Sequence, residues 1–151
     1  MHTEASVSDR LGAEHHRLEA LWKDACGAME RQTPSHLAIK SFADGLRRHI
    51  RDEEDVLFPA FEEHTGMNAQ AGPTAVMRME HRQLEALLMD LAAVSAGNAV
   101  SESKTQAALS LLLGNHDAKE EGMLYPMMDR AFKADVRSTL LARIETFRQT
   151  D

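Results

Sequence analysis

The sequence predicts an all-α protein: an antiparallel up-down-up-down bundle of four helices, followed by a short fifth helix near the C-terminus. Apolar residues recur at intervals of three and four along most of the chain, and no segment alternates apolar and polar residues as a half-buried strand does. Four long helical segments are joined by short loops, which makes consecutive helices antiparallel neighbours. The helical pattern of the first half also returns in the second half.

The first two predicted helices form a hairpin. The first spans about 9–30, with Ser8 as its N-cap. The second runs from Pro34, which suits a first helical turn, to about His64. Pro59 falls inside this second helix. Because proline lacks an N–H and clashes with the preceding turn, we expect it to kink the helix or end it early.

The third and fourth helices form a second hairpin. Pro73 opens the third helix, and Gly97-Asn98 is expected to end it. Ser101 or Ser103 can then cap the fourth helix. We expect one domain over residues 1–151, because this length suits a single core.

Beyond the two hairpins, a shorter apolar pattern at helical spacing predicts the fifth helix. We place this C-terminal helix at about 134–148 and the bundle itself at about 9–131.

Composition and charge exclude several classes of protein. The 17 Lys and Arg against 24 Asp and Glu give a net charge of −7, which argues against non-specific nucleic-acid binding and against docking on anionic membranes. No apolar run approaches the roughly 20 residues of a membrane-spanning helix. The first residues lack the basic and apolar regions of a secretory signal. The single cysteine, Cys26, excludes an internal disulfide and favours a reducing compartment. We therefore expect a cytoplasmic protein without nucleic-acid or membrane partners, and of unknown oligomeric state.

The internal repeat relates the two hairpins. Glu14–Leu21 matches Glu80–Leu87 at an offset of 66 residues, and His49–Pro59 matches His116–Pro126 at an offset of 67. Two such hairpins related by a pseudo-two-fold axis would bring equivalent residues face to face at the centre of the bundle.

Six polar residues of the repeat fall where the helical period requires core residues. Each hairpin contributes one His from its first helix and a His-x-x-x-Glu pair from its second; the six are His15, His49, Glu53, His81, His116 and Glu120. Residues four apart stack on one helix face, about 6 Å apart along the axis. Burial of four imidazoles and two carboxylates without partners would cost several kcal/mol for each charge. A bound cation would remove this cost.

The number and type of these residues indicate a dinuclear metal site. One metal ion could not use all six side chains, and a structural zinc site would use four ligands and prefer cysteine. A mixed set of imidazole and carboxylate ligands in a helical bundle favours iron. The alternative is a metal-free buried network of hydrogen bonds.

Two motif copies, His-x-x-x-Glu-Glu running into Leu-Phe-Pro and Leu-Tyr-Pro, accompany a single His in each of the first and third helices. This set resembles the hemerythrin-like HHE cation-binding family over residues 9–130. The resemblance implies a four-helix bundle with two non-heme iron ions, bridged by oxo or hydroxo. It implies that His15, His49, His81 and His116 are terminal ligands and that Glu53 and Glu120 bridge the irons.

The sequence departs from the oxygen-carrying members that it resembles. Those proteins carry a second His on the third helix, where this chain has Glu85, and take the last carboxylate from the position of Glu121. We assign the bridge to Glu120, which keeps the stacked i+4 spacing. With one imidazole fewer, the centre has an additional open position unless another carboxylate closes it. Glu19 and Glu85 each follow a predicted ligand His by four residues. They could ligate the metal, orient an imidazole, or lie exposed on a helix edge.

A more open, carboxylate-rich centre moves the expectation from oxygen carriage toward reactive chemistry. The resemblance implies a di-iron protein that binds or reacts with dioxygen, peroxide or nitric oxide in oxidative or nitrosative stress response. Whether it is an oxidoreductase with turnover stays open. The alternative is an iron or oxygen sensor, or a metal store, without turnover.

Three further residues near the motifs are expected outside the ligand set. Glu54 and Glu121 directly follow the two predicted bridging residues and should rotate away into salt bridges or hydrogen bonds to imidazoles. Tyr125 lies five residues after Glu120, so ligation would require a local distortion of the helix near Pro126.

Overall fold

The computed structural model describes residues 5–94 and 99–150, and every regular element within these ranges is helical. The all-α prediction is therefore confirmed. The elements in chain order are α1 (Val7–Glu30), α2 (His36–Asp52), η1 (Glu53–Leu57), α3 (Phe58–Thr65), α4 (Pro73–Ala93), α5 (Ala99–Lys119), η2 (Glu120–Leu124), α6 (Tyr125–Ala131) and α7 (Ala134–Thr150), where η marks a π-helical turn.

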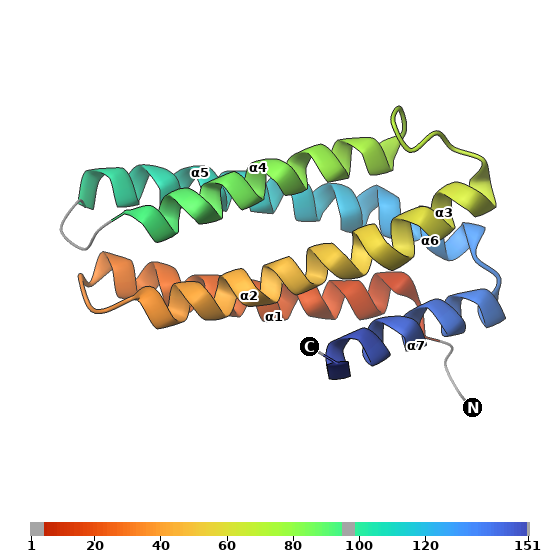
Figure 1. Cartoon of the computed structure of the whole chain (residues 1–151), viewed down its shortest axis with the longest axis horizontal. Coiled ribbons are helices and arrows are strands. Elements are labelled where there is room, and N and C mark those ends of the chain that lie inside the picture. Colours follow the sequence, from red (N-terminus) through yellow and green to blue (C-terminus); the bar gives the residue numbers. More distant parts are fainter. Residues whose placement is uncertain (1–4, 95–98, 151) are drawn as a thin grey trace.

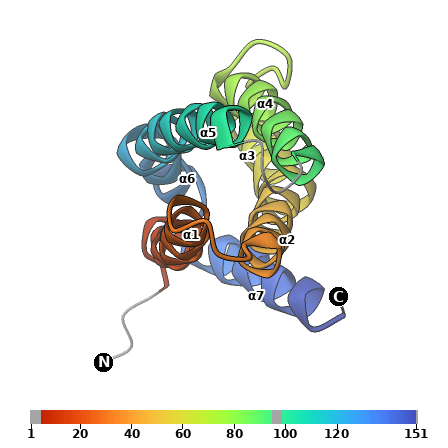
Figure 2. The same cartoon turned by 90° about the vertical axis from the view of Figure 1, so that its left-hand side faces the viewer.

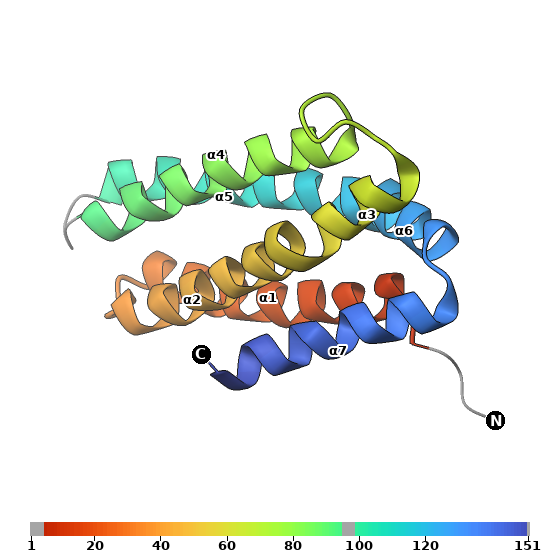
Figure 3. The ribbon, with the colours of Figure 1, turned by 45° about the vertical axis from the view of Figure 1, so that its right-hand side comes forward.

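The long helices α1, α2, α4 and α5 run lengthwise, with α1 beside α2 and α4 beside α5 (Figure 1). Viewed from the end, they surround a common axis, and α2 also contacts α4 while α1 contacts α5 (Figure 2). The C-terminal helix α7 lies along the outside of α1 and α2 and contacts α2 and η1 (Figure 3). None of the described helices is long and apolar enough to cross a membrane.

The start of α1 differs from the prediction. The helix begins at Val7, and its N-cap is Ser6, whose hydroxyl accepts a hydrogen bond from the Asp9 N–H at 2.9 Å. Ser8 is not the cap. Its N–H and that of Val7 donate instead to the Asp129 carboxylate, at 3.1 and 2.7 Å. A side chain from α6 therefore satisfies helix-end donors that a local cap would otherwise leave open.

The second hairpin also differs in its boundaries. Helix α4 ends at Ala93, and the predicted stop at Gly97-Asn98 lies outside the described residues. Helix α5 already includes residue Ala99, so Ser101 and Ser103 lie within it and cannot be its N-cap.

Two prolines follow π-helical turns and do not end the helices. Pro59 and Pro126 lie in the first turns of α3 and α6, directly after η1 and η2. A first turn tolerates proline because its N–H needs no partner there. Each π turn accommodates one extra residue in the helix, so a side chain five positions after a glutamate returns to the face of that glutamate.

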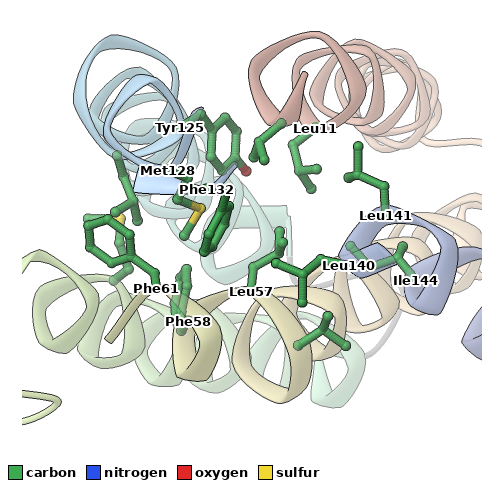
Figure 4. Packing of buried hydrophobic residues seen from close by; sticks show 14 residues of the cluster. Leu11, Leu57, Phe58, Phe61, Tyr125, Met128, Phe132, Leu140, Leu141 and Ile144 are labelled. Atoms are coloured by element: carbon green, nitrogen blue, oxygen red, sulfur yellow. The ribbon is translucent and has the colours of Figure 1, made fainter. Parts of the chain in front are cut away.

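The core consists of two apolar clusters along the bundle axis. The Phe61 cluster joins η1, α3, η2, α6 and α7 with residues of α1 and α4. Figure 4 shows Leu140 of α7 beside Leu57, with Leu141 on the side of Leu11. The Trp22 cluster fills the other end and comprises residues such as Leu18, Trp22, Phe42, Leu84, Leu88 and Leu109. The predicted apolar face of the fifth helix is thus buried against the Phe61 cluster.

Candidate metal centre

The six repeated His and Glu residues lie together in a polar layer between the two apolar clusters. Along α1, for example, His15 stands between Leu11 of the Phe61 cluster and Leu18 of the Trp22 cluster. No more than 4% of the surface of any of the six is exposed. They come from all four long helices and both π turns; they are His15, His49, Glu53, His81, His116 and Glu120.

Their donor atoms form two groups that share one residue. The four-donor set comprises Glu53, His81, His116 and Glu120, and the three-donor set comprises His15, His49 and Glu120. Within each set, one ligand atom per residue lies within 4.8 Å of every other. The Glu120 Oε1 atom lies 3.1 Å from His15 Nε2 and 3.3 Å from His116 Nε2, so this carboxylate reaches both sets.

Buried polar atoms at the centre lack hydrogen-bond partners among the described residues. Four of them, Glu53 Oε1, His81 Nε2, His116 Nε2 and Glu120 Oε2, belong to the four-donor set. The His81 Nε2 and Glu53 Oε1 atoms are 3.1 Å apart, but their orientation leaves both without a hydrogen bond. An unsatisfied buried polar group costs roughly 1–3 kcal/mol, and a cation held by these four residues would offer such atoms a partner. Imidazole and carboxylate donors without thiolate suit iron, manganese or zinc, so the residues fit a metal ion.

The electrostatics of the layer favour positive charge. Burial lowers the pKa of His15, His81 and His116, but hydrogen bonds and attraction to buried carboxylates outweigh burial and raise each pKa to about 9. Burial and repulsion by Glu120 raise the pKa of Glu53. Burial also opposes ionisation of Glu120, yet its close contacts with the Glu53 carboxyl and with the His116 and His15 imidazoles hold its pKa well below the usual range. Without a metal, protons on imidazoles balance the buried negative charge.

The outer nitrogens of the four-donor imidazoles have carboxylate acceptors. His81 Nδ1–H donates to Glu54 Oε2 at 2.5 Å, and His116 Nδ1–H donates to Glu80 Oε1 at 2.9 Å. Glu80 also pairs with Lys119. These bonds fix the proton on Nδ1 and direct Nε2 to the centre. Sequence reasoning did not select Glu80. The signal that was overlooked is the Glu-His pair with which the repeated segments Glu14–Leu21 and Glu80–Leu87 begin.

The imidazoles of the three-donor set have different surroundings. The Nδ1 atoms of His15 and His49 are buried and have no hydrogen-bond partner among the described residues. Glu121 Oε1 is 3.6 Å from His15 Nδ1, beyond hydrogen-bonding distance, and its side chain is 45% exposed. Asp117 Oδ1 lies 3.4 Å from His15 Nε2, and burial raises the pKa of Asp117 to about 6. Asp117 has no acidic counterpart in the other repeat, so the motif comparison gave no signal for it.

Tyr125 reaches the centre through a local distortion of the helix, the condition that the sequence indicated for its ligation. Its hydroxyl donates to Glu53 Oε2 at 2.8 Å and to Glu120 Oε1 at 3.0 Å. The same oxygen lies 3.1 Å from His15 Nε2 and 3.3 Å from His49 Nε2. The π turn η2 is this distortion, because its extra residue returns the fifth position after Glu120 to the core face.

The equivalent residue in the first repeat is Phe58. Its ring stacks on the His81 ring with centroids 5.8 Å apart and an interplanar angle of 4°. One side of the centre therefore carries a hydroxyl where the other carries an apolar ring.

The two further carboxylates that the sequence raised as candidates lie away from the centre. Glu19 is 60% exposed in its side chain and lies 3.7 Å from Lys23. Glu85 is 41% exposed in its side chain and binds the Arg47 guanidinium through both carboxylate oxygens. The structure therefore brings the six repeated residues together but not these two.

A pocket of about 710 Å³ opens between α2 and α4 and reaches the layer from outside. Its wall includes Arg51 and Arg82, and it extends to Glu54 and His81. Of the four buried imidazoles, His81 is the one that lines it. The outer edge of the four-donor set thus faces a solvent-connected space.

Comparison with protein families gives a match over most of the chain. The family model described as the hemerythrin HHE cation binding domain matches residues 6–128, which include all six buried ligand candidates. A search of curated proteins and a search of solved structures each found no match.

Proposed function

The chain belongs to the hemerythrin HHE cation-binding domain family, and from this premise we propose that it holds two non-heme iron ions within an up-down-up-down bundle. The observation that supports two ions is the shared position of Glu120 between two donor sets. We assign one ion to His81, His116, Glu53 and Glu120, and the other to His15, His49 and Glu120.

We assign Glu53 a bridging role together with Glu120. Its Oε1 atom lies 3.1 Å from His81 Nε2 and 3.5 Å from His49 Nε2, which places the carboxylate between the two sets. Two bridging carboxylates would hold the ions near each other, as dinuclear chemistry requires.

We further propose that the centre reacts with a small oxidant or diatomic molecule: dioxygen, peroxide or nitric oxide. Iron would supply open coordination positions and redox equivalents when bound. The protein excludes larger substrates, because the layer is buried between the Phe61 and Trp22 clusters. The pocket between α2 and α4 offers an approach to its edge.

Tyr125 would supply a hydrogen-bond donor inside this site. Burial and the two nearby carboxylates raise the pKa of its hydroxyl well above the usual range, so it keeps its proton at neutral pH. The proton on Tyr125 Oη is held between Glu53 and Glu120 and is available to a small ligand that enters the centre.

Metal analysis followed by turnover tests this function. We expect about two irons per chain after anaerobic reconstitution with ferrous ion, and repeated consumption of peroxide or nitric oxide. Glu19→Gln is a matched control that alters an exposed carboxylate. Reaction limited to one equivalent would favour a sensor or metal store. Failure to bind iron after reconstitution would overturn the proposal.

A further inference from the structure

We propose that the two metal positions are unequal and fill in a fixed order. The four-donor set binds the first ion, and the three-donor set accepts the second only when the Tyr125 hydroxyl gives way. This inference rests on the proposed dinuclear function and adds the roles of Glu54, Glu80 and Tyr125 to it. The three residues are positioning residues in this scheme and not ligands.

The four-donor set is already arranged for a cation. Its four unsatisfied atoms include two imidazole Nε2 atoms and two carboxylate oxygens. The Nδ1 hydrogen bonds to Glu54 and Glu80 orient both rings with Nε2 toward the centre. When a metal ion replaces the Nε2 proton, these bonds keep the remaining proton on Nδ1 and increase the basicity of the ligating nitrogen. Removal of such an outer partner typically lowers metal affinity by about 10- to 100-fold. Metal binding to this set therefore needs little further ordering of the side chains.

The three-donor set lacks this support. The Nδ1 atoms of His15 and His49 have no hydrogen-bond partner among the described residues, so no acceptor fixes their tautomers. It also has one donor fewer, unless the Glu53 or Asp117 carboxylate extends to it. Weaker ligand basicity and fewer donors both predict a lower affinity for the second ion.

The hydroxyl of Tyr125 stands among the three donors. It lies within 3.3 Å of both His15 Nε2 and His49 Nε2, the atoms that a metal would bind. It also holds Glu53 Oε2, the oxygen that Glu53 would need to free in order to bridge. A second ion must therefore break or displace these hydrogen bonds. At the four-donor set, the equivalent Phe58 stacks on a ring and makes no such contact.

The order can be tested by titration of the metal-free protein with Co²⁺, whose visible absorption reports each bound ion, in competition with a chelator. We expect two separate steps in the wild type. His116→Ala should remove the tighter step, and His49→Ala should remove only the weaker one. Far-UV circular dichroism of each variant verifies that it is folded.

Two positioning variants address the cause of the order. Glu54→Gln should weaken the tighter step by about tenfold or more, while Glu121→Gln, its repeat equivalent at 3.6 Å from an imidazole, should leave that step unchanged. Tyr125→Phe should strengthen the weaker step.

The outcomes separate this inference from the proposed function. Two equivalents that bind in one step, or a tighter step that survives His116→Ala and is lost in His49→Ala, would overturn the order while the dinuclear function stands. No second equivalent at any Co²⁺ concentration would overturn both.

Discussion

Tyr125 and Phe58 occupy equivalent positions in two near-copies of one helix hairpin, and this difference adds to the asymmetry of the centre. The phenol hydroxyl contacts both central carboxylates, whereas the phenyl ring packs flat against His81. Because of the phenol oxygen, one side of the centre has an internal hydrogen-bond donor, whereas the other side has an apolar ring. In the proposed dinuclear centre, such a difference would give the two metal positions different surroundings.

The six repeated residues were predictable because their evidence is local. Each stands where the apolar period requires a core residue, and each recurs in the second hairpin. Tyr125 was not predictable by the same count, since the count assumes an α-helical register and the π turn changes it. Proline directly after the tyrosine was the available sign of that change.

At this residue scale, we predict that Glu120→Ala removes both metal ions and Glu53→Ala leaves about one. Glu120 is common to both donor sets, whereas Glu53 completes only the four-donor set, so the other ion keeps His15, His49 and Glu120 when the Glu53 bridge is lost. The measurement is metal content per chain by elemental analysis after reconstitution, with Glu63→Ala as an exposed control. Equal losses in the two variants, or full occupancy in Glu120→Ala, would contradict the shared role of Glu120.

At the scale of elements, the two π turns position residues of the centre and also allow a proline in the helix that follows. Each π turn begins with a glutamate and is followed by an aromatic residue. Both side chains lie on the same side of the helix. Each π turn is also followed by a helix, α3 or α6, that has a proline in its first turn. Sequence rules predicted an interruption at Pro59 but not its form. The Asp129 cap of α1 was unpredictable for another reason, because its partners are more than 120 residues apart.

A group of hydrogen-bonded side chains, Glu62, Thr74 and Arg78, holds α3 against α4 near the centre; we call it the polar clasp. Glu62 accepts hydrogen bonds from Thr74 Oγ1 at 2.5 Å and from both terminal nitrogens of Arg78 at 2.5 and 3.1 Å. The Arg78 guanidinium also lies 5.4 Å from the centre of the Phe58 ring, which itself stacks on His81. The clasp therefore supports the apolar wall of the four-donor set.

We predict that Glu62→Gln lowers the free energy of unfolding at neutral pH by roughly 1–3 kcal/mol, as loss of a charged hydrogen-bonded pair does. The hydrogen bonds from Arg78 lower the pKa of Glu62 in the folded protein. Its contribution is therefore present above the ordinary pKa of 4.5 and is lost as the pH falls through the lower folded value. Denaturant unfolding of wild type and variant should show a difference that shrinks on acidification.

The adjacent Glu63 is exposed and provides the matched control, since Glu63→Gln should leave stability unchanged within about 0.5 kcal/mol at every pH. A difference between wild type and Glu62→Gln that persists at low pH would contradict the ionic origin of the effect.

At the scale of the whole molecule, a polar layer separates two apolar clusters. The sequence predicted a single core, and the repeat predicted that equivalent polar residues meet at the centre of the bundle. The sequence could not predict where α7 lies, because an apolar stripe indicates that a helix is buried but not against which elements. Helix α7 packs against α2 and η1, a choice that depends on the three-dimensional arrangement of those elements.

This arrangement leads to a final prediction about metal removal. The two clusters bury large side chains on both sides of the layer, including Phe42 and Phe61, so the helices retain a core without metal. The layer itself then holds unsatisfied buried atoms, which a bound ion would stabilise. We expect the chelated protein to keep its helical circular dichroism but to melt at a lower temperature. Free metal at about 100 times its dissociation constant should restore roughly 3 kcal/mol. His116→Ala should greatly reduce this gain. Loss of helicity on chelation would instead indicate a chain that folds only with metal, and an unchanged melting temperature would argue against an ion in the core.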